Sequence, residues 1–147
     1  MADVQQGASG ALFNRVPFMG LLGMQRTLSE AGRAQLVVDG RSELTNLIGS
    51  VHGGVVLTLL DVVMASAAVS QVNFERTAVT LGMTSQFLRP GHGPLTADGQ
   101  VCEVDGDVVH CRAEVHDAQG RTVALAQGCF RYLPLSAAAP HPIGDKT

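Results

Sequence analysis

Charged residues are scarce in this sequence, and the cationic ones are scattered. Only 16% of the 147 residues are charged, the net charge is −3, and the ten lysine and arginine residues form no run. A chain that binds a phosphate backbone carries a basic patch, so nucleic acid is not an expected partner. Hydrophobic residues make up 46%, which indicates a globular chain whose uncharged surface is partly buried against other subunits.

Cysteine is too sparse for a disulfide framework. The three cysteines, Cys102, Cys111 and Cys129, are an odd number, which indicates free thiols in a reducing compartment. The first residues lack the cationic segment followed by an apolar run that marks a secretory signal. We therefore expect a cytoplasmic protein.

The length fits one domain with a hydrophobic core. We expect this domain over residues 12–133, between flexible ends at 1–11 and 134–147 that are rich in small residues and proline. The stretch from Gly53 to Val72 is nearly all apolar and is as long as a membrane span. Asp61 lies at its middle, where a bilayer disfavours charge, so we expect the core helix of a soluble protein and no membrane partner.

Strands are expected on both sides of this helix. A turn or short helix is predicted over 17–23, and a long strand follows the helix and ends at Pro90. Alternation places Val79, Leu81, Met83 and Phe87 on one face of that strand and Thr80, Gly82, Thr84 and Gln86 on the other. The remaining predicted strands cover residues 24–29, 34–39, 95–104, 108–117 and 122–132. An antiparallel sheet wrapped around one helix, an α+β fold, accounts for this order.

Asp61 is the first candidate for chemistry. It is the only charged residue between His52 and Glu75. A buried carboxylate is costly, so it requires either a structural partner, such as an arginine or backbone amides, or a catalytic role. The sequence leaves both open.

The helix is expected to begin at the glycine pair of the run SVHGG. Glycines in a first turn leave backbone N–H groups uncovered where the helix dipole is positive, which suits a carbonyl oxygen that gains negative charge. Equally, Gly53 and Gly54 could only permit a tight bend. Gly53 and Asp61 are about 12 Å apart along the helix. They could act on one carbonyl only if a two-fold axis placed Gly53 of one subunit beside Asp61 of another.

These features together resemble the PaaI-type thioesterases of the hotdog fold. The resemblance covers roughly residues 17–133 and is most specific at Asn46, six residues before His52-Gly53-Gly54, with Asp61 following. The runs that carry it are PFMGLLGM, NLIGSVHGGVVLTLLD, AVTLGMTSQFLRP and AEVHDAQGRTVALAQGCFRY.

The resemblance implies a hotdog fold whose dimers often pair into tetramers, and hydrolysis of an acyl-CoA thioester without metal or organic cofactor. It implies that the Gly53 N–H polarises the thioester carbonyl and that Asp61 acts as general base or as nucleophile. Asn46 would hold substrate or water, or would only cap its loop. Thr80 would orient the attacking water, or would be an ordinary strand residue. His52 would mainly orient the loop and its backbone.

The candidate substrate-binding residues are Gly54, Gly82 and Arg89. Gly82, expected on the substrate side of its strand, replaces a larger or polar residue, which leaves the shape of the acyl pocket open. Arg89 could bind a CoA phosphate or form an ion pair between subunits. The cysteines and histidines of the last strands lack the spacing of a metal site or a Cys-His nucleophile.

Two other functions compete with hydrolysis. One is a non-catalytic acyl-CoA binding or sensing protein of the same fold, although a pure binder has no need of an acid in its core. The other is a hotdog hydratase or dehydratase, whose arrangement of histidine and acid is not found in the sequence. The sequence also does not identify the acyl group of the substrate. Aromatic groups, such as phenylacetyl or hydroxylated benzoyl, and medium-length aliphatic chains all fit a pocket between subunits.

Overall fold

A computed structural model of the chain describes residues 10, 13 and 15–138. Every predicted strand and helix is present, with bounds within two or three residues of those expected. The elements are α2 (Pro17–Leu22), β1 (Gln25–Glu30), β2 (Arg33–Val38), the 3-10 helix η1 (Ser42–Leu44), α3 (Gly53–Gln71), β3 (Arg76–Phe87), β4 (Leu95–Asp105), β5 (Val108–His116), β6 (Thr122–Pro134) and the 3-10 helix η2 (Leu135–Ala138).

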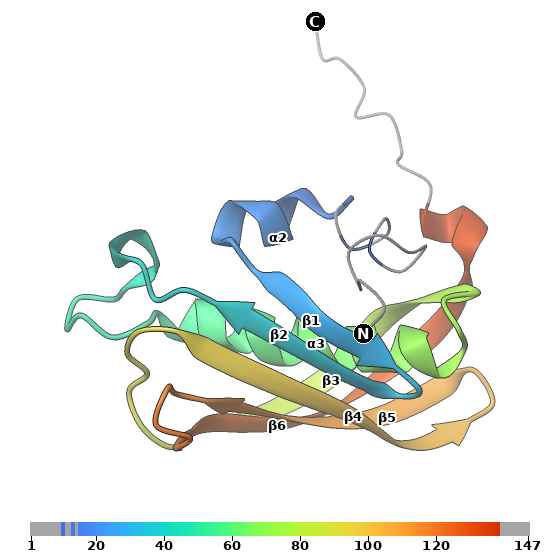
Figure 1. The fold of residues 1–147 in the computed structure, drawn as a ribbon. Helices are drawn as coiled ribbons and strands as arrows, with labels where there is room; N and C mark the ends of the chain where they lie inside the picture. The colour runs from blue at the N-terminus through green and yellow to red at the C-terminus, as the bar shows by residue number, and fades with distance from the viewer. Residues whose placement is uncertain (1–9, 11–12, 14, 139–147) are drawn as a thin grey trace, which may run out of the picture.

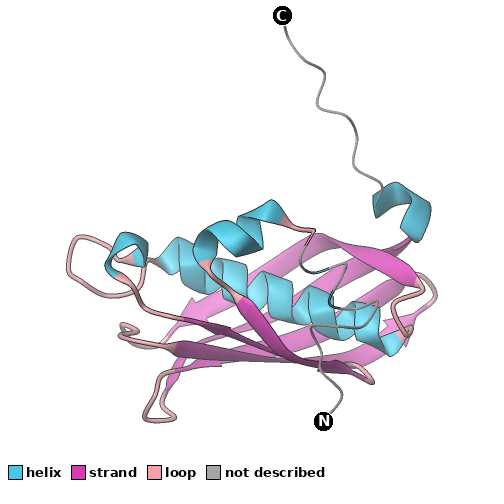
Figure 2. Ribbon diagram, turned by 45° about the horizontal axis from the view of Figure 1, so that its top comes forward, coloured by secondary structure: helices cyan, strands magenta, loops and turns pink. Residues whose placement is uncertain are grey.

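The six strands form one antiparallel sheet in the order β1-β2-β4-β5-β6-β3. This sheet curves around α3, as Figures 1 and 2 show, so the predicted hotdog fold is confirmed. β1 and β3 are its two edges. Because β6 runs to Pro134 and η2 follows it, regular structure extends past the boundary expected at residue 133. The expected flexible ends lie largely outside the described residues.

The central helix packs its apolar side chains against the concave face of the sheet. Leu59, Leu60, Val63 and Met64 are fully buried there. At Gly99 of β4 the two layers nearly touch, because a Cβ atom at this glycine would lie 2.6 Å from the carbonyl oxygen of Val63. α3 is long and apolar enough to cross a membrane, but 56% of its apolar 18-residue stretch is buried inside the protein. A core helix passes the same test of length and composition.

The sheet does not cover α3 on every side, which corrects one expectation. A stripe of the helix stays half-buried in the gap between the two sheet edges, and it includes Asp61, Val62, Ala65 and Val69. The predicted acid is therefore reachable from outside the protomer rather than sealed in the core. An open apolar stripe is the surface that a second subunit or a ligand would cover.

The expected alternation along β3 is wrong beyond its middle. The register with β6 shifts between Thr80 and Gly82, so Leu81 is an extra residue in the strand. A β-bulge of this kind moves the following side chains to the opposite face. Thr80, which precedes the bulge and is paired with the buried Phe130, points toward α3, whereas Gly82, which follows the bulge, lies in a hollow on the outer face that Arg112 also lines.

Candidate active site

The acid predicted to carry the chemistry is held by a hydroxyl group of the neighbouring strand. Oγ1 of Thr80 donates a hydrogen bond of 2.6 Å to Oδ1 of Asp61. Among the described residues no arginine, lysine or histidine forms a salt bridge with this carboxylate. The geometry thus gives a half-buried carboxylate on the open stripe of the helix, with one of its two acceptor oxygens held by Thr80.

The start of α3 presents a single uncovered backbone N–H group. Nδ1 of His52, the residue that precedes the helix, accepts a hydrogen bond of 2.9 Å from the N–H of Gly54. The N–H of Gly53 has no acceptor among the described residues. Since Nδ1 is the acceptor, a neutral His52 ring carries its proton on Nε2. His52 is therefore engaged in shaping the helix start, and Gly53 offers the free donor.

Asn46 holds the loop that leads into this helix. Its Oδ1 accepts from the N–H groups of Ile48 and Ser50, each at 3.1 Å, and its Nδ2 donates to Oγ of Ser50 at 2.7 Å. These bonds close a turn and fix the approach to His52. The capping role that the sequence left open is the one seen in the protomer.

A hollow of about 380 Å³ lies beside this loop. Asn46, Gly53 and Arg89 are among the residues that line it. Arg89 is exposed, and its Nη1 donates to the carbonyl oxygen of Thr122 at 2.7 Å. Phe87 of β3 also lines the hollow and packs against Gly53, where a Cβ atom would lie 3.7 Å from the ring.

Within one protomer the predicted site residues lie in two separate groups. Asn46, His52, Gly53 and Arg89 surround the start of α3, while Asp61 and Thr80 lie two turns further along the helix. Gly82 belongs to neither group. The separation along the helix that suggested a two-subunit site is therefore present in the structure.

Sequence reasoning missed several apolar residues around the helix start. Leu47 and Ile48, beside Asn46, are 103% and 75% exposed, and Phe87 and Leu88 are each about half exposed. Two apolar residues at the tip of a loop are a signal that the sequence does contain, since such residues expose surface that a partner can cover.

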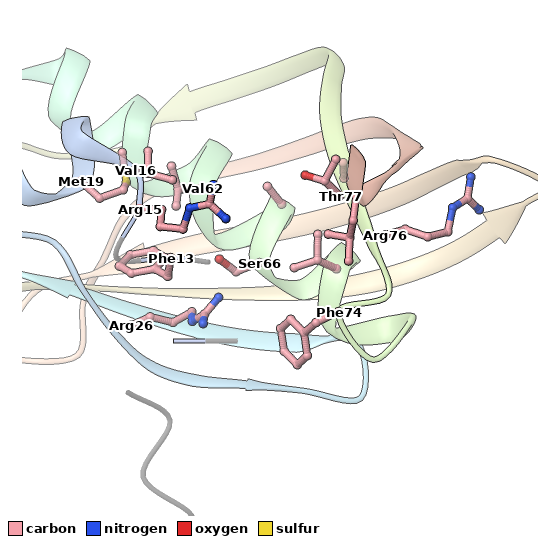
Figure 3. Close-up of a pocket in the computed structure, with 14 residues that line it drawn as sticks. Phe13, Arg15, Val16, Met19, Arg26, Val62, Ser66, Phe74, Arg76 and Thr77 are labelled. Carbon is pink, nitrogen blue, oxygen red and sulfur yellow. The ribbon is translucent and has the colours of Figure 1, made fainter. Parts of the chain in front are cut away.

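A second cavity, of about 510 Å³ (Figure 3), is lined by Val62, the residue that follows Asp61 in α3. Val62 and Ala65 of α3 and Ala78 of β3 contribute to its lining, and Thr80 lies two residues beyond Ala78. Aromatic and cationic side chains complete it: Phe13, Phe74, Arg15, Arg26 and Arg76. These residues come from separate parts of the chain and share no sequence pattern, so the sequence analysis did not identify them.

The chain is similar to known proteins in sequence and in fold. Residues 48–124 match the sequence model of the family described as "Thioesterase superfamily". Two curated archaeal proteins, both named "Putative esterase", are similar to the chain. The one from Saccharolobus solfataricus is 32% identical over 105 residues, which cover 71% of this chain and 74% of the relative. The one from Halobacterium salinarum is 31% identical over 124 residues, with coverages of 77% and 82%.

Solved structures show the same fold. The PaaI protein from the phenylacetic acid degradation operon of E. coli is 29% identical, with a TM-score of 0.78 and coverage of 84% of this chain and 88% of that one. A mutant of the phenylacetic acid degradation protein PaaI from Thermus thermophilus is 27% identical, with a TM-score of 0.72 and coverages of 80% and 99%.

Proposed function

The chain belongs to the thioesterase superfamily, and from that premise we propose that it hydrolyses acyl-CoA thioesters to a free acid and CoA. The observation that carries the proposal is the hydrogen bond between Thr80 and Asp61, which orients a carboxylate at the open stripe of the core helix. A protein that only bound acyl-CoA would gain nothing from an acid in this place. The acyl groups that we consider are aromatic ones such as phenylacetyl, and medium-length chains.

The complete site requires two subunits. β3 is an open sheet edge, and it connects both halves of the site: Thr80 binds Asp61, and Phe87 packs against Gly53. Two β3 strands that paired antiparallel, about an axis midway between positions 80 and 87, would set Phe87 of one subunit opposite the partner's Thr80. Gly53 of one subunit would then face the partner's Asp61.

The exposed side chains of this edge support such a dimer. Val79 and Leu81 of β3 are 42% and 51% exposed in the single protomer. An unpaired strand with apolar side chains is unfavourable in water and tends to pair with another strand. The low charge of the chain fits the same assembly, and the outer face of the sheet remains for pairing of dimers into a tetramer.

In this site the thioester carbonyl oxygen accepts the N–H of Gly53, which stabilises the negative charge that forms on attack. Asp61 takes a proton from water while the water oxygen bonds to the carbonyl carbon. The C–S bond then breaks, and the proton passes from Asp61 to the CoA thiolate. Direct attack by Asp61, through an acyl anhydride that water later hydrolyses, gives the same products.

The other predicted residues have supporting roles. Asn46 and His52 hold the loop and the helix start in shape, so that the Gly53 N–H points at the carbonyl. Thr80 orients Asp61. Arg89, exposed at the rim of the hollow beside Gly53, is placed to bind a CoA phosphate.

The test is turnover of phenylacetyl-CoA and hexanoyl-CoA, followed by the loss of the thioester absorbance. Asp61→Asn should lose activity by roughly 10²- to 10⁴-fold, with its circular dichroism spectrum unchanged because the side chain is only half-buried. A matched control is Asp98→Asn, an exposed residue that accepts a hydrogen bond of 2.9 Å from Gln35. Full activity of Asp61→Asn would refute the assignment, and saturable binding without turnover would favour the binding protein.

A further inference from the structure

The loop before α3 carries two apolar side chains at its tip. Leu47 and Ile48 are the two most exposed large apolar side chains in the described part of the chain. Their backbone is nevertheless fixed, because the N–H of Asn46 donates to the carbonyl oxygen of Ser50 at 2.8 Å and the N–H of Ile48 donates to Oδ1 of Asn46 at 3.1 Å. We call residues 46–50 the apolar tip. A loop that is already ordered loses little conformational entropy when a partner covers it.

The apolar tip is tied to the segment that follows β3. Val51, which comes directly after the tip, donates its N–H to the carbonyl oxygen of Gly91 at 2.8 Å. Ile48 lines the same hollow as Gly53 and Leu88. The tip therefore sits at the C-terminal end of the β3 edge, and a subunit that pairs with this edge meets the tip as well.

The 510 Å³ cavity lies toward the other end of the same strand (Figure 3). Ala78 lines it and is two residues before Thr80 on the inward face of β3, which places it about 7 Å along the strand from the residue that holds Asp61. From α3 the lining extends from Val62 to Val69, about 10.5 Å along the helix. The volume is that of a small-molecule site.

The proposed dimer brings the tip and the cavity together. Pairing of two β3 edges about the same axis sets Arg89 of one subunit opposite the partner's Ala78. Arg89 lines the hollow beside the tip, so the tip would lie over the partner's cavity. The two helices lead to the same position. When Gly53 faces the partner's Asp61, the tip before Gly53 faces the part of the partner's helix that leads from Asp61 toward Val69.

We propose that the apolar tip of one subunit closes the partner's 510 Å³ cavity, that this cavity holds the acyl group, and that Ile48 limits the length of acyl chain that fits. Ile48 is then a specificity-determining residue supplied by the other chain. The inference rests on the proposed function, because the thioester must lie between Gly53 and the partner's Asp61 for the acyl group to enter the cavity. Contact between the tip and the open stripe of α3 removes both apolar surfaces from water.

The acyl-length selectivity of Ile48 variants tests this role. The ratio of kcat/KM for decanoyl-CoA to that for hexanoyl-CoA should rise roughly tenfold in Ile48→Ala and fall by a similar factor in Ile48→Trp, as expected when an apolar pocket gains or loses room for a methylene group or more. Both variants should fold, because the side chain is exposed. Val104→Ala, at an exposed apolar residue of β4, should leave the ratio unchanged. An unchanged ratio in both Ile48 variants overturns the inference.

Mixed dimers show which subunit supplies this wall. Dimers of an Asp61→Asn chain and a Gly53→Pro chain have one intact site, which takes Gly53 and the apolar tip from the first chain and the acid and the cavity from the second. Ile48→Ala on the first chain should raise the ratio as in the homodimer, and on the second chain it should have no effect. The reverse pattern places the wall in the same chain as the cavity and overturns the inference. Absence of activity in every mixture, with an active wild-type protein, overturns it too.

Binding of two thioethers separates the inference from the proposed hydrolysis. In calorimetry, Ile48→Ala should raise the affinity for S-decyl-CoA relative to S-hexyl-CoA by a factor similar to that seen in turnover. Such a change without hydrolysis of either thioester supports the wall and overturns the proposed function. Hydrolysis of both thioesters, with no effect of Ile48 on either ratio, overturns the inference and leaves the proposed function standing.

Discussion

The hydroxyl group of Thr80 donates a hydrogen bond to the carboxylate of Asp61 across the contact between β3 and α3, with 2.6 Å between the two oxygens. Hydrogen bonds from a hydroxyl to a carboxylate are short and about twice as strong as bonds between neutral groups. This bond fixes the carboxylate and ties it to the strand proposed to form the dimer. The orientation of the acid therefore depends on Thr80, which points inward just before the bulge.

Thr80→Val tests this dependence. Valine keeps the shape of threonine and removes the donor, so Asp61 should lose its fixed orientation. We expect kcat to fall roughly ten- to hundredfold, since hydrogen bonds to charged groups are worth about 1.5–3 kcal/mol. Thr80→Ser, which keeps the hydroxyl, should retain most of the activity. Steady-state kinetics of the three proteins would check this, and equal rates for the valine and serine variants would contradict it.

The sequence predicted the elements of this fold well because their signals are local. An apolar run of helical length and a strand that ends at a proline depend on neighbouring residues only. The candidate pair Gly53 and Asp61 stood out for the same reason, as glycines at a helix start and a lone charge in an apolar run. Their separation along the helix followed from helix geometry alone.

The bulge and the second cavity could not be predicted in this way. The bulge at Leu81 is defined by the register between β3 and β6. The alternation of apolar and polar residues along β3 alone does not indicate it. The stack of Arg26 with Phe13 and Phe74 joins three distant segments. The exposure of Asp61 depends on where the sheet edges stop, which is a property of the whole fold.

Gly53→Pro should remove catalysis without harming the fold. Proline replaces the N–H group with a ring carbon, and it suits the first position of a helix, where that N–H has no helical acceptor. The preceding His52 already has φ −58° and ψ 136°, which a following proline accepts. We expect kcat to fall roughly 10²- to 10³-fold, as on loss of one oxyanion donor.

Gly53→Ala is the matched control for that change. It keeps the N–H, and its Cβ atom would make an ordinary contact of 3.7 Å with Phe87. Its activity should stay far above that of the proline variant, while thermal unfolding shows both proteins folded. A fully active proline variant would exclude the Gly53 N–H as the group that polarises the carbonyl.

The stability of the protein should fall at alkaline pH because of Cys111. Burial, with a smaller contribution from Cys102, raises the pKa of the Cys111 thiol from 9.0 to about 12. Between these values the unfolded chain releases the proton and the folded chain keeps it, so the free energy of unfolding decreases as pH rises. The free energy of unfolding should fall by at most about 1.4 kcal/mol for each pH unit, and solvent screening makes the decrease smaller.

Urea unfolding of the wild-type protein and of Cys111→Ala, from pH 8 to 10.5, would measure this effect. The alanine variant should be less stable overall, because it loses buried sulfur, but its stability should fall less steeply with pH. Other groups titrate in the same range in both proteins, so the difference between the two slopes isolates Cys111. Equal slopes would show that the thiol does not contribute.

Mixing two inactive variants tests whether each site is shared between subunits. Asp61→Asn and Gly53→Pro should each be inactive as homodimers, since both sites carry a lesion. A dimer with one chain of each kind has one site with both lesions and one with neither. Random exchange makes about half of the dimers mixed, so the mixture should recover roughly a quarter of the wild-type activity.

Co-refolding of the two variants from urea, followed by turnover measurement, would give this value. Mixing without refolding should recover nothing if the subunits do not exchange. A second control, co-refolding of Asp61→Asn with Asp61→Ala, should also stay inactive, since every site then lacks the acid. If Gly53 and Asp61 served the same site from within one chain, every chain in the first mixture would carry a lesion in its own site, and no activity would return.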